Sequence, residues 1–267
     1  ALPRAFLERL ASVFNCIEAT GVWPESLASG VISMLSKGDG LGAKDLRPIT
    51  VTSVLYRIWS ACRVKEVLVW QEQWASDALL GFRHAHGCED VYWQIALQVE
   101  CAHHNSSPIC GLTVDFAKAF DRVPLHFVFA LAKHMGMPDR VLSPLQSLYT
   151  QMQRRFKIGA HVGDSFRATN EILQGCPLSI LILSVLIQVW MTAVPVECPG
   201  ADPFCYADNA NAVASSRAQL DSVLGVTADF ARLTNMKLNV PKCYSWATSA
   251  RLRRELASLT ADGESLK

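Results

Sequence analysis

Apolar positions recur along the chain at helical spacing in some segments and as short continuous runs in others. Six segments predict helices, from this spacing or from a serine or proline at their start: Leu2–Glu18, Ser53–Trp70, Glu89–His103, Pro124–Met135, Pro138–Met152 and Arg217–Thr234. Short apolar or extended stretches predict strands at Val31–Leu35, Leu46–Thr52, Cys110–Phe116, Lys237–Leu238 and Tyr244–Trp246. A turn is expected between the first two strands, at Lys37–Gly40.

Two segments have the pattern of β-hairpins. The first pairs Arg154–Ile158 with Ser165–Ala168 across a loop that contains Gly159 and Gly163. The second is Pro203–Ser215, which has a tight turn in its middle. Because helices and antiparallel hairpins are mixed from Cys110 onward, the sequence predicts an α+β fold with helices on one face of a small antiparallel sheet.

One segment raises the alternative of a membrane span. Residues 172–196 form a run of 25 positions without a formal charge, which is long enough to cross a bilayer. However, Pro177 and Pro195 bracket a shorter stretch, and Ser184, Gln188 and Thr192 recur every four residues. A polar stripe of this kind predicts a buried helix of a globular domain that begins at Pro177, so no membrane is expected.

Charge distribution and cysteine content limit the classes of protein to which the chain can belong, but they do not identify one. The 267 residues carry a net charge of +1, but Arg232–Arg254 holds six bases and no acid. Such a stretch suits either a polyanionic partner or an ordinary solvated face. The nine cysteines are odd in number and contain no CxxC pair, which favours a reducing, intracellular environment over a disulfide framework or zinc site.

Two carboxylates stand at the ends of predicted strands. Asp115 closes the run CGLTVD, and Asp208 lies at the tip of the second hairpin, next to Asn209. Considered alone, the two acids are equally well explained as a helix cap and a turn residue. If the strands are neighbours, two carboxylates brought together repel one another unless a cation such as Mg²⁺ neutralises them. That arrangement suits phosphoryl or nucleotidyl transfer.

Six motifs occur in a fixed order: LRPITVTSVLYRI, LLGFRHAHGCED, LTVDFAKAFDRV, LQGCPLSILI, CYADN and LNVPKCYSW. In these motifs the chain resembles the reverse transcriptases of non-LTR (LINE-like) retrotransposons, and more distantly those of group II introns. The resemblance implies the fingers and palm of a right-hand polymerase. Residues 1–107 would form the fingers region and 108–250 the palm, with part of the fingers interleaved. Residues 251–267 would be a truncated tail leading to a thumb that the chain lacks.

The resemblance also implies a set of catalytic residues. Asp115 and Asp208 would hold the catalytic Mg²⁺ ions, with Mn²⁺ as an alternative, and Phe116 is placed with the metal-binding residues. Phe120 lies where the family keeps a bulky side chain under the sugar, and a ring there would exclude a 2′-hydroxyl. Lys242 would donate a proton to the leaving pyrophosphate.

Further residues are assigned to substrate binding. Gln174 and Gly175 would lie closest to the incoming nucleotide, because glycine allows a close backbone approach. Arg47 would bind the triphosphate oxygens, and Lys37 is a second candidate for the same work. Arg83 is expected to lie near the template.

The implied reaction is RNA-templated addition of dNTPs to the 3′-hydroxyl of a DNA primer. RNA template, DNA primer and dNTP are therefore the expected partners. The sequence leaves the oligomeric state undetermined. The expected localisation is intracellular, and nuclear if the chain comes from a eukaryotic retroelement.

Several positions depart from the family pattern. Asn209 stands where relatives carry a second aspartate, and His84–Gly87 replaces an expected basic turn. An amide oxygen can bind a cation but brings no charge. Two alternatives follow: a catalytically impaired relic that retains nucleic-acid binding, and an RNA-synthesising polymerase, against which Phe120 argues.

Overall fold

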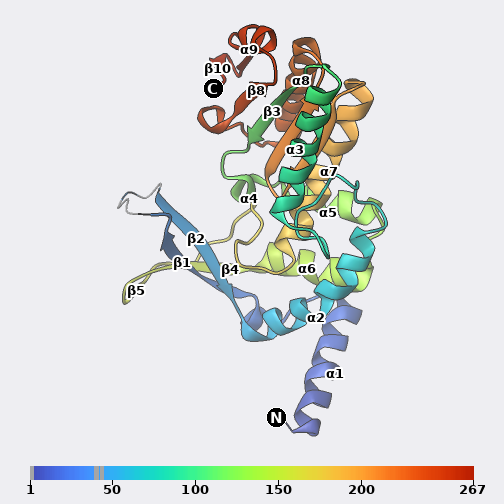
Figure 1. Ribbon diagram of the computed structural model, residues 1–267. Coiled ribbons are helices and arrows are strands. Elements are labelled where there is room, and N and C mark those ends of the chain that lie inside the picture. The colour runs from blue at the N-terminus through green and yellow to red at the C-terminus, as the bar shows by residue number, and fades with distance from the viewer. Residues whose placement is uncertain (1–2, 39–41, 43–44) are drawn as a thin grey trace. The chain divides into compact units, whose positions relative to one another are not determined.

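The computed structural model describes residues 3–38, 42 and 45–267, which divide into two compact units. Unit 1 consists of Ala1–Trp70 and Pro124–Ile182, and unit 2 of Gln71–Val123 and Leu183–Lys267 (Figure 1). Each unit combines two separate stretches of the sequence. The fingers and palm boundaries expected from the sequence stay a prediction. Leu2 and the tip of the turn expected at Lys37–Gly40 lie outside the described residues.

Unit 1 is organised around a four-stranded sheet with the strand order β2-β1-β4-β5. Its strands are β1 (Ser29–Ser36), β2 (Leu46–Thr52), β4 (Gln153–Ile158) and β5 (His161–Val162). Strand β1 pairs antiparallel with β2 and parallel with β4. Val31 is in register with both Val51 and Arg155, so these three side chains share one face of the sheet.

The first predicted hairpin forms with a different second strand. Lys157 pairs with Val162 and Ile158 with His161, inside the stretch expected to be a loop. The expected second strand was Ser165–Ala168. Of its described residues, Phe166 alone pairs with the first strand, through an isolated antiparallel bridge to Arg154. The parallel pairing of β1 with β4 was not expected, because the two strands lie more than a hundred residues apart in the sequence.

Helices of unit 1 begin and end close to the predicted positions. They are α1 (Arg4–Thr20), α2 (Val54–Gln71), α5 (Leu125–His134) and α6 (Asp139–Gln151), with a short 3₁₀ turn at Glu25–Leu27. The serine cap expected for α2 is confirmed, because the Tyr56 N–H donates to Ser53 Oγ at 3.3 Å. The ring of Trp23 lies 5.5 Å from those of Tyr56 and Trp59, and all three rings are buried.

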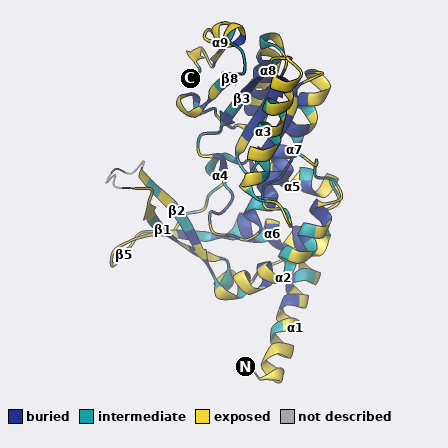
Figure 2. Ribbon diagram, viewed as in Figure 1, coloured by how far each residue is buried: buried dark blue, intermediate teal, exposed yellow. Residues whose placement is uncertain are grey.

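Unit 2 is organised around an antiparallel sheet with the order β6-β7-β3-β8. Its strands are β3 (Cys110–Asp115), β6 (Asp202–Tyr206), β7 (Asn209–Ala214) and β8 (Tyr244–Ala247). Its helices are α3 (Cys88–His104), α4 (Ala119–Arg122), α8 (Arg217–Thr234) and α9 (Ala250–Leu256), and α8 packs on β3 and β7. Figure 2 shows the central strand β3 largely buried. The α+β fold class is confirmed, whereas α4, α9 and the short strands β9 (Thr260–Ala261) and β10 (Glu264–Ser265) were not expected.

The uncharged segment forms helix α7 (Ser179–Glu197). Among the described residues, one helix is long and apolar enough to cross a membrane, and it is α7, with 61% of its apolar window buried inside the protein. The polar stripe has partners, since Gln188 accepts from the Ser76 N–H at 3.0 Å and donates to Thr192 at 3.1 Å. Its burial agrees with the core helix that the sequence predicts.

Candidate functional site

Asp115 and Asp208 lie on neighbouring elements of unit 2. Strand β3 ends at Asp115, and β3 pairs with β7 so that Asp115 lies opposite Asn209. The hairpin β6–β7 pairs Tyr206 with Asn209, which leaves Ala207 and Asp208 as a two-residue turn. Ala207 has φ +58°, a backbone conformation that costs a non-glycine residue free energy and that often marks functional turns. The fold therefore brings the two predicted acids to one end of the sheet.

Electrostatics also link the two carboxylates. Burial raises the pKa of Asp208, and the negative charge of Asp115 raises it further. A hydrogen bond from the Asp208 backbone and the positive charge of Lys242 act in the opposite direction. Ionised Asp208 is thus disfavoured in the protein alone, and a cation between the two acids would relieve both causes.

The donor set at this end of the sheet fits a divalent cation. It offers two carboxylates, and Asn209, which is exposed, adds an amide oxygen at the position directly opposite Asp115. Phe116 is 2% exposed, so its contribution to a metal would be its backbone carbonyl. No cluster of three or more His, Cys, Asp or Glu side chains suited to a metal occurs in the described part of the chain, which agrees with an amide at position 209.

Lys242 and Phe120 also belong to unit 2. Lys242 lies in the 3₁₀ turn η3 (Val240–Lys242), with its Nζ 3.9 Å from Asp115 Oδ2 and its side chain 69% exposed. A pair at that distance with an exposed ammonium contributes little to stability, so the ammonium stays available to a substrate. Phe120 is partly exposed on the short helix α4. The catalytic and sugar-selecting roles of these residues stay predictions.

Four of the predicted nucleotide-binding residues lie on β2 or beside it in unit 1: Lys37, Arg47, Gln174 and Gly175. The Thr50 N–H donates to the Gln174 carbonyl at 2.9 Å. Gly175 has φ +109°, and a Cβ there would meet the Thr50 carbonyl oxygen at 3.1 Å, so this turn requires glycine. Arg47 is exposed on the same strand. Lys37, just past β1, pairs its backbone N–H with the Asp45 carbonyl at 2.7 Å.

The GFR motif packs against the turn that carries Asp208. The Leu80 N–H donates to the Cys205 carbonyl at 2.8 Å, and the rings of Phe82 and Tyr206 lie 5.7 Å apart. A Cβ on Gly81 would lie 2.3 Å from the Ala207 nitrogen. Glycine at position 81 therefore lets this segment support the backbone of the hairpin.

Arg83, expected near the template, has its donors engaged within the chain. Its guanidinium forms a bidentate pair with Glu72, at 3.0 and 2.5 Å, and donates to the carbonyls of Ser76 and Leu79. The side chain is 7% exposed. These contacts explain the conformation of the segment before GFR and lend no support to the predicted template contact.

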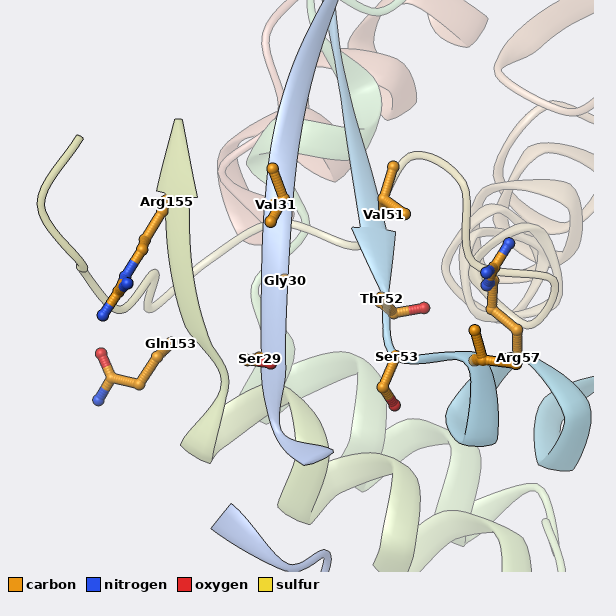
Figure 3. Close-up of a pocket in the computed structure, with 10 residues that line it drawn as sticks. Ser29, Gly30, Val31, Val51, Thr52, Ser53, Arg57, Gln153 and Arg155 are labelled. Atoms are coloured by element: carbon orange, nitrogen blue, oxygen red, sulfur yellow. The ribbon is translucent and has the colours of Figure 1, made fainter. Parts of the chain in front are cut away.

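A groove of about 540 Å³ lies over the sheet of unit 1. Figure 3 shows Arg155 on β4 at one side and Arg57 near the start of α2 at the other, with β1 between them. The floor is formed by Gly30, Val31 and Val51. Val54 adds a further apolar side chain, and the remaining lining residues are polar: Ser29, Thr52, Ser53 and Gln153.

The groove has the chemistry of an anion-binding surface. None of the described residues that line it carries a carboxylate. Arg57 and Arg155 are both exposed, and neither forms an ion pair with any described residue. Two unpaired guanidinium groups beside an apolar floor suit a nucleic-acid strand, whose phosphates and bases need both kinds of contact.

Two features of the site were not predicted from the sequence. Asn239 donates its amide to Asp115 Oδ2 at 2.6 Å, and Thr113 donates to the buried Asn211 at 2.7 Å. Asn239 lies in the LNVPK motif, so its position close to Lys242 was a usable signal. Asn211 lies two residues after Asn209 on the same face of β7. Its partner depends on the register between β7 and β3, which the sequence does not show.

Comparison with known sequences gives one family. Residues 35–252 match the family described as reverse transcriptase (RNA-dependent DNA polymerase). The chain is 23% identical over 227 residues to the Pol polyprotein from the type-2 retrotransposable element R2DM of Drosophila melanogaster, covering 82% of this chain and 21% of that protein. The RNA-directed DNA polymerase from the mobile element jockey of the same species is 23% identical, with 91% and 28% covered. The chain thus spans about a quarter of the length of these relatives.

Comparison with solved structures gives the fold. Apo telomerase from Candida tropicalis, truncated from its C-terminal domain, aligns with a TM-score of 0.67 at 13% identity, covering 92% of this chain and 56% of that one. Telomerase from the same species in complex with a TWJ fragment of telomeric RNA aligns with a TM-score of 0.66 at 13% identity, covering 92% and 45%. This similarity confirms the right-hand polymerase architecture expected from the motifs.

Proposed function

Since the chain belongs to the reverse transcriptase (RNA-dependent DNA polymerase) family, we propose that it extends a DNA primer with dNTPs on an RNA template. The observation that carries this proposal is the pair Asp115 and Asp208 at one end of the unit 2 sheet, where burial and the charge of Asp115 raise the pKa of Asp208. The relatives named above are polymerases of retrotransposable elements, so the chain is the polymerase portion of a non-LTR-type element.

Asp115 and Asp208 would hold Mg²⁺, with Mn²⁺ as an alternative. When bound, the metal supplies charge neutralisation for the triphosphate and acidification of the primer hydroxyl. Lys242, whose exposed side chain lies 3.9 Å from Asp115 Oδ2, would protonate the leaving pyrophosphate. Phe120 would exclude a ribose 2′-hydroxyl and thereby select dNTPs.

Unit 1 would supply the binding surfaces. Arg47 would hold triphosphate oxygens bidentately, while the turn at Gln174 and Gly175 would allow the nucleotide to approach the backbone. The groove with Arg57 and Arg155 would bind the phosphate backbone of the template strand. A telomerase of the same fold is described in complex with RNA, which supports nucleic acid as the partner.

Primer extension tests the proposal. The chain, alone and joined to the flanking residues of its own reading frame, is given an RNA template, a DNA primer, dNTPs and Mg²⁺ or Mn²⁺. We expect extension that Asp115→Ala abolishes and Asp202→Ala preserves, because Asp202 is an exposed acid at the far end of the same hairpin. Extension by Asp115→Ala at the parental rate would overturn the assignment, and a preference for rNTPs would favour an RNA-synthesising enzyme.

Asn209 supports a second candidate, a catalytically impaired relic that still binds nucleic acid. The amide places no second charge opposite Asp115. Extension that appears only after Asn209→Asp would establish the relic. Equal extension by parent and variant would exclude it.

A further inference from the structure

We propose that Asn239 is a positioning residue that fixes the carboxylate of Asp115 for cation binding, an inference that rests on the proposed function. The side-chain amide of Asn239 donates to Asp115 Oδ2 at 2.6 Å. Hydrogen bonds to a charged acceptor are shorter and stronger than neutral ones. Asp115 itself is partly buried, with its side chain 19% exposed, so few water molecules can replace this donor.

The backbone of Asn239 is held from both sides. Its N–H donates to the Asp115 carbonyl at 2.8 Å, and its own carbonyl accepts from the Lys242 N–H at 2.8 Å. The neighbouring segment continues this pairing, since the Ala117 N–H donates to the Lys237 carbonyl at 2.7 Å. The amide therefore approaches Asp115 from a backbone whose place is already set, which is the requirement for orienting a ligand.

Lys242 cannot perform the same task. Its Nζ lies 3.9 Å from the same oxygen, beyond hydrogen-bond distance, and the side chain is 69% exposed. A flexible ammonium at that distance does not fix the direction of the Asp115 oxygens. Asn239 is thus the short, directional contact, and Lys242 is the mobile charge.

The hydrogen bond leaves Asp115 with one oxygen engaged and one free. Among the described residues, Oδ2 receives the contacts of Asn239 and Lys242, and no hydrogen bond or ion pair reaches Oδ1. A carboxylate anchored by one oxygen presents the other in a fixed direction. Hydrogen-bond donors that orient a metal ligand in this way commonly contribute ten- to a hundredfold to metal affinity.

The test uses two variants of Asn239 and one matched control. Asn239→Leu removes the donor while keeping the branched shape and the number of heavy atoms, and Asn239→Ala truncates the side chain at Cβ. Asn105→Ala is the control, because Asn105 is an exposed asparagine of unit 2 at the end of α3, and its side chain has no hydrogen bond to a described residue. All proteins are first checked for cooperative unfolding.

Mn²⁺ affinity, measured by electron paramagnetic resonance, is the first readout. We expect both Asn239 variants to bind Mn²⁺ about tenfold more weakly than the parent, while Asn105→Ala binds normally. In primer extension, kcat should fall with the KM for dNTP unchanged, because the nucleotide contacts are intact. Unchanged Mn²⁺ affinity in a folded Asn239→Leu variant would overturn the inference.

A double-mutant cycle in metal-free protein is the second readout, and it needs no activity. Unfolding equilibria of the parent, Asn239→Leu, Asp115→Ala and the double variant give the coupling between the two side chains. We expect a coupling of about tenfold in the unfolding constant. No coupling would refute the inference whatever the enzyme does, whereas coupling in a protein that neither binds Mn²⁺ nor extends primers would refute the proposed function.

Discussion

Asp115 and Asn209 face each other directly across strands β3 and β7. Asn209, which departs from the family pattern, is therefore the cross-strand partner of the first aspartate that we propose as a metal ligand. Directly opposed like charges destabilise a pair of strands, and asparagine at position 209 avoids that repulsion. The amide favours stability of the metal-free protein but places no charge at the proposed cation site.

Asn209→Asp should lower the stability of the metal-free protein and raise its affinity for Mg²⁺. The expected loss is about 0.5–1 kcal/mol, because two like charges then face each other on adjacent strands. Urea unfolding in EDTA and in excess MgCl₂ checks this. Metal should restore more stability to the variant than to the parent; an equal response of both proteins to Mg²⁺ would count against cation binding at this turn.

Asp208→Asn should stabilise the metal-free protein at neutral pH. The folded pKa of Asp208 is raised above its ordinary value of 3.8, by burial first and by Asp115 second, so the folded state holds the proton more tightly than the unfolded state. Stability then falls as the pH rises from 3.8 through the folded pKa, and the penalty is complete above it. Amide substitution removes that penalty.

The measurement is urea unfolding of parent and variant from acidic to neutral pH. The free energy of unfolding of the variant should rise relative to that of the parent as the pH rises. Below about pH 3.8 the difference between the two proteins should no longer change with pH. Asp202→Asn, at an exposed position of the same hairpin, is the control and should show no such trend. A constant difference at all pH values would mean that Asp208 is not electrostatically disfavoured.

Gly81→Ala should destabilise the protein by about 1–3 kcal/mol through overpacking. The new Cβ would meet the Ala207 nitrogen at 2.3 Å, and backbone cannot move aside cheaply there. Gly225→Ala is the matched control, since no atom lies within 4 Å of its Cβ position in helix α8. That change should stabilise by about 0.5–1 kcal/mol, because alanine favours helices. Thermal unfolding of both variants checks the opposite signs.

Arg57→Ala and Arg155→Ala should each weaken RNA binding and lower the slope of log affinity against log salt by about one. Both guanidinium groups line the groove of unit 1 and lack an ion pair with any described residue. Arg4→Ala is the control, because Arg4 pairs with Glu8 on the exposed face of α1. Fluorescence anisotropy with a single-stranded RNA at several salt concentrations gives both quantities. An unchanged salt slope in both variants would exclude phosphate binding in the groove.

Local patterns in the sequence predicted most helices because each helix closes its own hydrogen bonds. Arg217–Thr234 was predicted with the bounds that the structure shows, and the hairpin around Asp208 formed as expected. The motifs also made Asp115 and Asp208 the candidate metal ligands. The order of the motifs along the chain indicated the family, and the resemblance to the family implied the reaction.

Tertiary structure decided what depends on contacts between distant segments. The pairing of β1 with β4, the contact of Asn239 with Asp115 and the engagement of Arg83 by Glu72 are all non-local. A sequence shows which residue types are present, and its local periods show which elements form. Strand register and side-chain partners follow from packing across the fold. They determine that Asn209 lies opposite Asp115 and that, among the described residues, no hydrogen bond or ion pair reaches Oδ1 of Asp115.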